Sequence, residues 1–279
     1  MNPAHYCQEK GAPPGSSAYY ALLQAPPARR ALLTALFALR RELEQLVEGG
    51  ADGSVTEAKF AWWRGEIEAF GAGRPTHPVT RALALPNGAA PLPPAALLAL
   101  VDAHERDYRQ GRYFDADGLR FHARHTGGAF AALVARESLP AAHADIDTDW
   151  ASALGTALTL AGLLAHLGDH ARHGRLYLPV DTMQRYGVTA ADITERRYTP
   201  AFTQMMQAQT ESVREALGAS RAALPRALRR PQRTLLALAG LAEALLDEVQ
   251  REDYAVLHQR LSLTPVRKLL IAWRRARFG

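Results

Sequence analysis

The residues best suited to chemistry include four polar side chains near the middle of the chain, at spacings of three and four. His166, Asp169, His170 and His173 lie within one short stretch. Two histidines four residues apart on a helix can present both imidazole nitrogens to a transition metal. No third ligand is evident nearby, so His166 and His170 are either weak metal ligands or polar residues that line a groove.

Two carboxylates earlier in the chain have the spacing that a hard cation requires. Glu44 and Glu48 are four residues apart and therefore share one face of a helix. Mg²⁺ prefers oxygen ligands, so this pair could hold one ion. In the alternative interpretation the face is solvated and Glu44 forms an ion pair with Arg40, also four residues away. The sequence favours the ion pair and leaves the magnesium site open.

The carboxylate pair lies in a segment whose apolar periodicity predicts a helix. Leu32, Leu36, Leu39, Leu43 and Leu46 recur at spacings of three and four, which is typical of an amphipathic helix. Similar spacing recurs along the chain, whereas the strand-forming residues Val, Ile and Thr are sparse. Helices are therefore expected over residues 28–47, 54–70, 95–110, 116–136, 150–167, 200–224, 231–250 and 265–276.

These elements predict an all-α fold with a single domain over residues 1–279. A chain of 279 residues and 30.4 kDa can bury a large core. It contains no internal repeat, and the proline-rich segment 86–94 is too short to separate two cores. Eight or more packed helices are the simplest arrangement.

Composition limits where the protein acts. A single cysteine, Cys7, excludes an intrachain disulfide framework and suits a reducing compartment. The first thirty residues contain no apolar run of signal-peptide length, and no stretch approaches the roughly 20 apolar residues that span a bilayer. The sequence therefore predicts a cytoplasmic protein, with any membrane contact peripheral.

The net charge of +5 suggests anionic partners. The arginines toward the carboxyl end have no interleaved aromatic residues and no known nucleic-acid-binding motif, which argues against nucleic acid. An anionic surface on the inner face of the membrane is the expected partner, because each basic residue near a bilayer adds about 1 kcal/mol. These arginines are Arg226, Arg229, Arg230, Arg233, Arg274, Arg275 and Arg277.

Several sequence blocks, in order along nearly the whole chain, resemble squalene/phytoene synthases, especially the bacterial presqualene diphosphate synthase branch. The resemblance implies the isoprenoid synthase fold, a helical bundle around a central cavity. In that family two aspartate-rich helical motifs face each other, and Mg²⁺ ions bridge them to the diphosphates of two prenyl substrates. The blocks are YCQEK at 6–10, GSSAYY at 15–20, AWWRGE at 61–66, GRLYLP at 174–179 and SLTPVRK at 262–268.

Both metal-binding motifs of the family are largely lost in this chain. The aspartates of the first motif align with Glu44, Gln45 and Glu48, so two lengthened carboxylates remain. In the second motif His166 and His170 replace the key aspartates. Imidazole is a poor Mg²⁺ ligand, so the three-metal arrangement implied by the family cannot simply be rebuilt.

The resemblance also indicates residues that could hold a diphosphate, since arginine suits bidentate contacts with phosphate oxygens. Asp107 and Tyr113 match the family as well, and no catalytic residue is assigned. The candidates for diphosphate binding are Ser16, Ser17, Tyr20, Arg40, Arg41, Arg172 and Arg175.

Two functions remain open. In the first, the chain is a pseudoenzyme that binds an isoprenoid or lipid, or acts with a protein partner in respiratory complex assembly. Residues 42–46 and 178–181 resemble the mitochondrial complex I assembly factor, which belongs to the same superfamily. In the second, it is a Mg²⁺-dependent farnesyltransferase that condenses two farnesyl diphosphates to presqualene diphosphate or squalene. The loss of most metal ligands favours the first.

Overall fold

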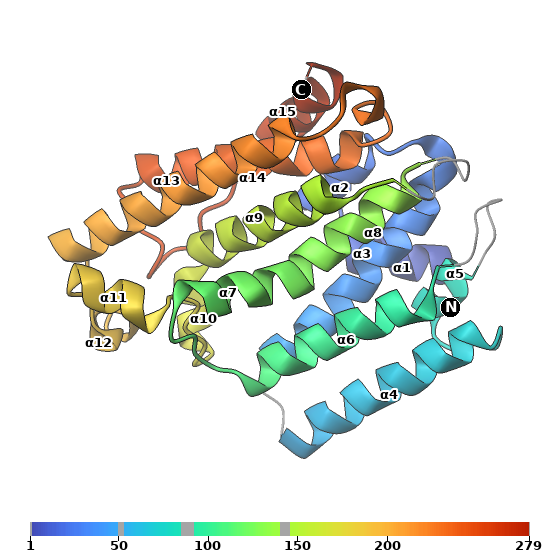
Figure 1. Ribbon diagram of the computed structural model, residues 1–279, viewed down its shortest axis with the longest axis horizontal. Coiled ribbons are helices and arrows are strands. Elements are labelled where there is room, and N and C mark those ends of the chain that lie inside the picture. Colours follow the sequence, from blue (N-terminus) through green and yellow to red (C-terminus); the bar gives the residue numbers. More distant parts are fainter. Residues whose placement is uncertain (1, 50–52, 85–91, 140–145, 279) are drawn as a thin grey trace.

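The polypeptide folds into helices that lie side by side, as a computed structural model of the chain shows (Figure 1). The structure describes residues 2–49, 53–84, 92–139 and 146–278, so most of the proline-rich segment 86–94 lies outside the described residues. Within these ranges there is no strand, and the one β-bridge joins Arg112 to Leu176. The expected all-α fold is confirmed.

A helix occupies each segment in which apolar periodicity predicted one. These helices are α3 (Pro27–Glu48), α4 (Gly53–Gly71), α6 (Pro94–Arg109), α7 (Ala116–Ala123) continued by α8 (Ala129–Glu137), α9 (Asp149–Ala165), α13 (Pro200–Ala222), α14 (Arg233–Arg251) and α15 (Pro265–Phe278). None of the described helices has the length and apolarity needed to cross a membrane.

The structure adds shorter helices that the sequence analysis did not predict. A helix of five to nine residues contains too few turns to establish an apolar period. These elements are α1 (Pro3–Gly11), α2 (Ser17–Leu22), α5 (Pro78–Leu83), α10 (Leu167–Arg172), α11 (Val180–Tyr186), α12 (Ala190–Thr194) and the 3₁₀ turn η3 (Arg226–Leu228).

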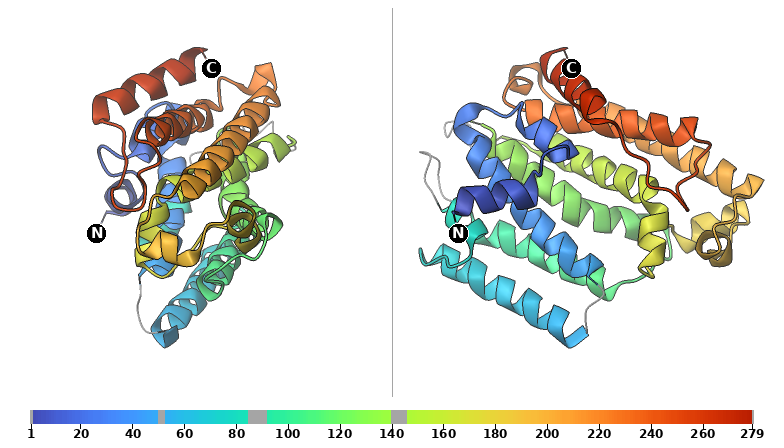
Figure 2. Two further views of the ribbon diagram at one scale, coloured as in Figure 1. Left: turned by 90° about the vertical axis from the view of Figure 1, so that its left-hand side faces the viewer. Right: turned by 180° about the vertical axis from the view of Figure 1, so that it is seen from behind.

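The long helix α3 forms the centre of the packing. It contacts α1, α5, α6 and α8, while α9 lies between α8 and the pair α13 and α14. At one edge α4 covers α6, and at the opposite edge α15 covers α14 (Figures 1 and 2). Leu33, Leu39 and Leu43 of α3 are fully buried, and each contributes about 1.5–3 kcal/mol. One cluster of buried side chains extends from Cys7 to Leu261 and joins most of the chain.

One wide turn interrupts the helix expected over residues 116–136. The π-helical turn η1 (Arg124–Gly128) separates α7 from α8. At this turn the backbone touches α9, because a Cβ atom added to Gly155 would lie 2.1 Å from the carbonyl oxygen of Gly127. The turn contributes Thr126 to the lining of an internal cavity. Single π turns inside helices often mark functional sites.

The helix expected over residues 150–167 ends two residues early, at Ala165. After a break at His166, α10 begins, and the backbone N–H of Gly168 donates to the carbonyl oxygen of Val256 at 3.2 Å. A Cβ atom on Gly168 would lie 2.4 Å from the carbonyl oxygens of Val256 and Leu257. The segment that joins α14 to α15 can therefore dock on α10 only because residue 168 is glycine.

We expect Gly168→Ala to destabilise the protein by about 1–3 kcal/mol, because the added methyl group meets backbone atoms that cannot rotate away. Gly218→Ala in α13 is the matched control, since a Cβ atom there meets nothing within 4 Å. It should be neutral or stabilising by up to about 1 kcal/mol. Urea denaturation measures both, and equal effects would contradict the close docking at Gly168.

Candidate functional site

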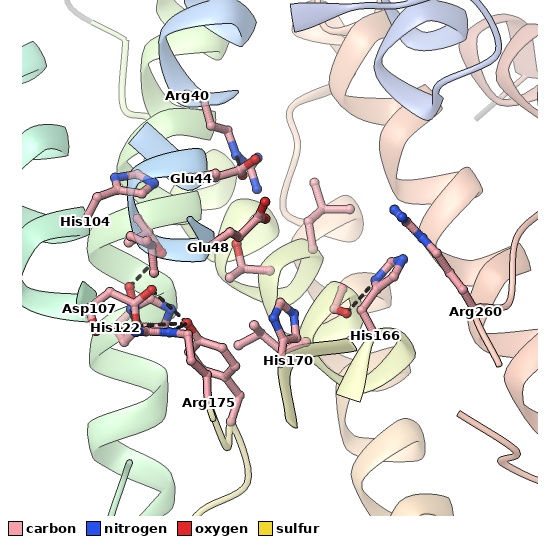
Figure 3. Close-up of a pocket in the computed structure, with 17 residues that line it drawn as sticks. Arg40, Glu44, Glu48, His104, Asp107, His122, His166, His170, Arg175 and Arg260 are labelled. Atoms are coloured by element: carbon pink, nitrogen blue, oxygen red, sulfur yellow. Dashed lines mark hydrogen bonds and ion pairs between the residues drawn. The ribbon is translucent and has the colours of Figure 1, made fainter. Parts of the chain in front are cut away.

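Two adjacent cavities lie inside the bundle, an inner one of about 320 Å³ and an outer one of about 930 Å³. Residues of α3, α6, η1 and α9 line the inner cavity, and residues near α1 and α2 help to line the outer one. Figure 3 shows the inner cavity with its charged and histidine side chains. Six residues line both cavities and are termed the ring: Arg40, Glu44, Glu48, His166, His170 and Arg260.

On the α3 side of the ring, arginines hold both carboxylates. Arg40 Nε donates to Glu44 at 2.7 Å, which is the predicted ion pair. Arg41 donates to the two oxygens of Glu48 at 3.0 and 2.9 Å and lies 3.4 Å from Glu44. Burial opposes the charge of Glu44, but Arg40, His104 and Arg41 together outweigh it and bring the pKa of Glu44 below its ordinary value. Both carboxylates are thus neutralised by the protein's own side chains.

The opposite side of the ring carries two imidazoles (Figure 3). His166 lies at the break between α9 and α10, and His170 lies within α10. Burial, reinforced by the neighbouring His166, lowers the pKa of His170 to about 4. Burial also lowers the pKa of His166, whose Nδ1 lies 2.9 Å from the Gly162 carbonyl oxygen. Both imidazoles are therefore neutral at pH 7. Arg260 completes this side, with its Nε 3.8 Å from Asp169.

This donor set does not fit the three-magnesium arrangement that the family resemblance implies. No group of three or more His, Cys, Asp or Glu side chains in the described part of the chain is placed to hold a metal ion. Glu44 and Glu48 are occupied by guanidiniums, and imidazole is a poor ligand for Mg²⁺. A single ion at the two glutamates, or a transition metal at His166 and His170, stays a prediction.

The far end of the inner cavity is a buried network around Asp107. Its carboxylate accepts hydrogen bonds from Tyr113 at 3.0 Å and Tyr177 at 2.9 Å, and lies 3.3 Å from the guanidinium of Arg175. Burial, together with Asp107, raises the pKa of both tyrosines above the ordinary value. His122 stacks on Tyr177. The network holds the ion pair of Asp107 and Arg175 in the wall of the cavity. Both tyrosines stay protonated at neutral pH.

Three of the seven predicted diphosphate-binding residues meet at the outer cavity. Arg40 and Arg41 project from α3, and Ser16 lies across from them at the start of α2. The Ser16 hydroxyl oxygen accepts the backbone N–H of Tyr19 at 3.0 Å and so caps α2. The role of these three residues in binding a diphosphate stays a prediction.

The other four are placed differently. Arg175 lines the inner cavity, but its guanidinium is engaged by Asp107 and Tyr177. Arg172 pairs with Asp169 and lines neither cavity. Ser17 and Tyr20 line neither cavity, and Tyr20 packs against a small apolar cluster that includes Leu241.

Several cavity residues were not identified as site residues from the sequence, among them Lys10, Arg260 and His104. Lys10 lines the outer cavity, where its ammonium group lies 3.1 Å from Glu42 and 2.6 Å from Gln45. Arg260 belongs to the ring, and His104 lines the inner cavity. Lys10 lies within one of the family-like blocks and Arg260 just before another, which was the only signal available for them.

We expect Asp107→Ala to destabilise the protein by about 3–5 kcal/mol, because the substitution leaves the Arg175 guanidinium buried without its counter-ion. Asp117→Ala is the matched control, since Asp117 is 89% exposed and pairs with Arg120 at the surface. Its effect should stay below about 1 kcal/mol. Chemical denaturation gives both values, and a small effect at Asp107 would show that the charge pair is not a structural requirement.

The low pKa of His170 makes stability depend on pH. The folded protein binds fewer protons here than the unfolded chain, so stability is full above pH 6.5 and falls as the pH drops toward 4. Between pH 7 and pH 5 this histidine should remove about 2 kcal/mol, a loss that His170→Gln should largely abolish. His5→Gln, at an exposed histidine, should retain the loss in urea titrations at both pH values. The same pH dependence in both variants would refute this origin.

Comparison with known proteins identifies the family. Residues 12–267 match the family model for squalene/phytoene synthase. The phytoene synthase of Arthrospira platensis is 27% identical, over 95% of this chain and 89% of that protein. The chloroplastic phytoene synthase of Narcissus pseudonarcissus is 25% identical over 94% of this chain, which spans 63% of that relative's length. Placement in the bacterial presqualene diphosphate synthase branch stays a prediction.

Solved structures show the same fold. A dehydrosqualene synthase in complex with ligand superposes with a TM-score of 0.82 and 18% identity, covering 99% of this chain and 96% of that one. Squalene synthase HpnC from Alicyclobacillus acidocaldarius superposes with a TM-score of 0.74 and 23% identity, covering 90% and 94%. The family prediction from the sequence blocks is confirmed, and the chain belongs to the squalene/phytoene synthase family.

Proposed function

We propose that this chain is a pseudoenzyme of its family, which binds one isoprenoid diphosphate or related lipid and does not condense two. The observation that carries the proposal is the pairing of Arg40 and Arg41 with the two carboxylates of α3, opposite neutral imidazoles. A leaving diphosphate must have its charge neutralised as it departs. Guanidiniums already bound to glutamates supply less of this stabilisation than a cluster of divalent ions.

The outer cavity nevertheless suits an anionic headgroup. Four basic side chains and three acidic ones line it, and guanidinium contacts can pass from a carboxylate to phosphate oxygens without loss of geometry. Ser16 adds a hydroxyl group on the far wall. The charged residues are Lys10, Arg40, Arg41, Arg260, Glu44, Glu48 and Asp169.

The size of the inner cavity supports one prenyl chain rather than two. Its volume of about 320 Å³ lies at the lower end of the range of about 300–1,000 Å³ for ligand pockets. Val47, Leu158 and Leu163 provide apolar wall, while the end of the cavity carries the charged pair of Asp107 and Arg175. A single tail can lie against the apolar wall without burying that pair further.

The competing function is head-to-head condensation of two farnesyl diphosphates. One observation supports this function: Glu44 and Glu48 both belong to the ring, where one Mg²⁺ could displace the arginines from their carboxylates. The proposed pseudoenzyme would instead act through its ligand or a protein partner, and the likeness to the mitochondrial assembly factor suggests a role in respiratory complex assembly. A cytoplasmic location with peripheral membrane contact is part of the same proposal, and the net charge of +5 suits contact with an anionic membrane surface.

The two functions predict opposite effects of neutralising the ring glutamates. In the pseudoenzyme, Glu44→Gln with Glu48→Gln removes two negative charges and frees two arginines, so farnesyl diphosphate should bind more tightly, by about 10-fold. Calorimetry with chelator, and then with Mg²⁺, should give one saturable site of similar affinity in the starting protein. Labelled farnesyl diphosphate should yield no presqualene diphosphate or squalene, with or without NADPH.

The control replaces two carboxylates away from the cavities, Glu57→Gln with Asp102→Asn, which are 57% and 53% exposed. This variant should bind farnesyl diphosphate like the starting protein. Product formation that the ring variant abolishes would overturn the proposal and establish an enzyme with a reduced metal set. Absence of saturable binding would overturn the proposed binding of an isoprenoid diphosphate. The protein would then be a scaffold for protein partners.

A further inference from the structure

The outward face of the last helix is apolar. Successive spacings of three, one and three place four large side chains on the same side of α15. Ala272 and Ala276 of the same helix, in contrast, are buried against the protein. The four outward residues are Val266, 67% exposed, Leu269, 44%, Leu270, 58%, and Trp273, 48%.

The same helix is strongly basic, with five basic residues and no acidic one: Arg267, Lys268, Arg274, Arg275 and Arg277. Three of them contact the protein itself: Arg267 pairs with Glu248 and Arg275 with Glu243, each at 2.7 Å, and Lys268 donates to the Gly15 carbonyl oxygen. No described carboxylate lies within ion-pair distance of Arg274 or Arg277. The guanidinium of Arg277 lies 5.9 Å from the centre of the Trp273 ring, at the edge of the apolar face.

We propose that this face of α15 docks on a bilayer that contains anionic phospholipid. An amphipathic helix with an apolar face and flanking arginines lies in the interfacial region, where tryptophan is favoured. Arg274 and Arg277 are placed to meet the headgroups while Leu269 and Leu270 enter the acyl boundary. A second copy of the chain is a poorer occupant, because two such basic faces would repel each other.

The helix α15 lies beside α2, whose N-cap Ser16 lines the outer cavity. The Lys268 ammonium group donates to the Gly15 carbonyl oxygen at 2.9 Å, which holds α15 beside α2. The view from behind shows α15, α1 and α2 together (Figure 2). A docked bilayer would therefore lie close to the cavity that is proposed to take an isoprenoid headgroup, a link that rests on the proposed function.

Sedimentation with vesicles tests the docking without any isoprenoid. We expect the protein to sediment with vesicles of phosphatidylcholine and phosphatidylserine at low salt, and not with pure phosphatidylcholine. High salt should reduce the bound fraction. On binding, tryptophan emission should shift to shorter wavelength, and Trp273→Phe should lose most of that shift.

Paired arginine variants test which surface binds. Arg274→Gln with Arg277→Gln should weaken partitioning about 30-fold at low salt, or about 5-fold for each charge removed. Arg81→Gln with Arg120→Gln removes the same net charge from exposed residues of α5 and α7. This control should stay within about 2-fold of the starting protein, and equal loss in both variants would overturn the assignment to α15.

An apolar variant separates the docking from ligand binding. Leu269→Gln with Leu270→Gln should lose vesicle binding yet keep its melting temperature and its farnesyl diphosphate affinity in solution. Failure of ligand binding in every variant would defeat the proposed function and leave the docking intact. No sedimentation of the starting protein with anionic vesicles would overturn the docking. A dimer in sedimentation velocity that this variant abolishes, without vesicle binding, would assign the face to self-association instead.

Discussion

A carboxylate inside a helical bundle must be neutralised, and in this chain guanidiniums neutralise the three that line the inner cavity. Arg40 and Arg41 hold Glu44 and Glu48, and Arg175 holds Asp107. Asp107 is the buried one, and an unpaired buried charge costs several kcal/mol, so its pairing with Arg175 stabilises the inner wall. Since the counter-charges are covalently part of the chain, the cavity walls do not need added cations to be stable.

The shape of the cavities depends on two places where backbones touch. Gly127 and Gly155 bring η1 against α9, and Gly168 admits the segment between α14 and α15. The first contact sets the width of the inner cavity between α9 and η1. The second places His166 and Arg260 on one side of the ring. Charge pairs on α3 and glycine contacts on α9 and α10 therefore determine the site together.

The sequence predicted a feature correctly where that feature depends on residues close together in the chain. The helices with several apolar repeats were predicted within a few residues of their ends, and the ion pair of Arg40 with Glu44 follows from spacing on one helix. The π turn η1 could not be foreseen, because it results from a backbone contact with α9. Arg260 and Lys10 enter the site from distant segments, whereas Tyr20, predicted there, faces an apolar cluster. Only tertiary packing decides such placements.

The hydrogen bond from Gly168 to Val256 has a mechanical consequence. It ties the histidine side of the ring to the same stretch of chain that leads into α15, with Arg260 between the two. The segment between Val256 and α15 therefore connects this wall of the cavity to the last helix. Any difference in free energy that one end imposes on the other must be equal in both directions. A coupling between occupancy of the cavity and the position of the last helix would act through residues 256–264.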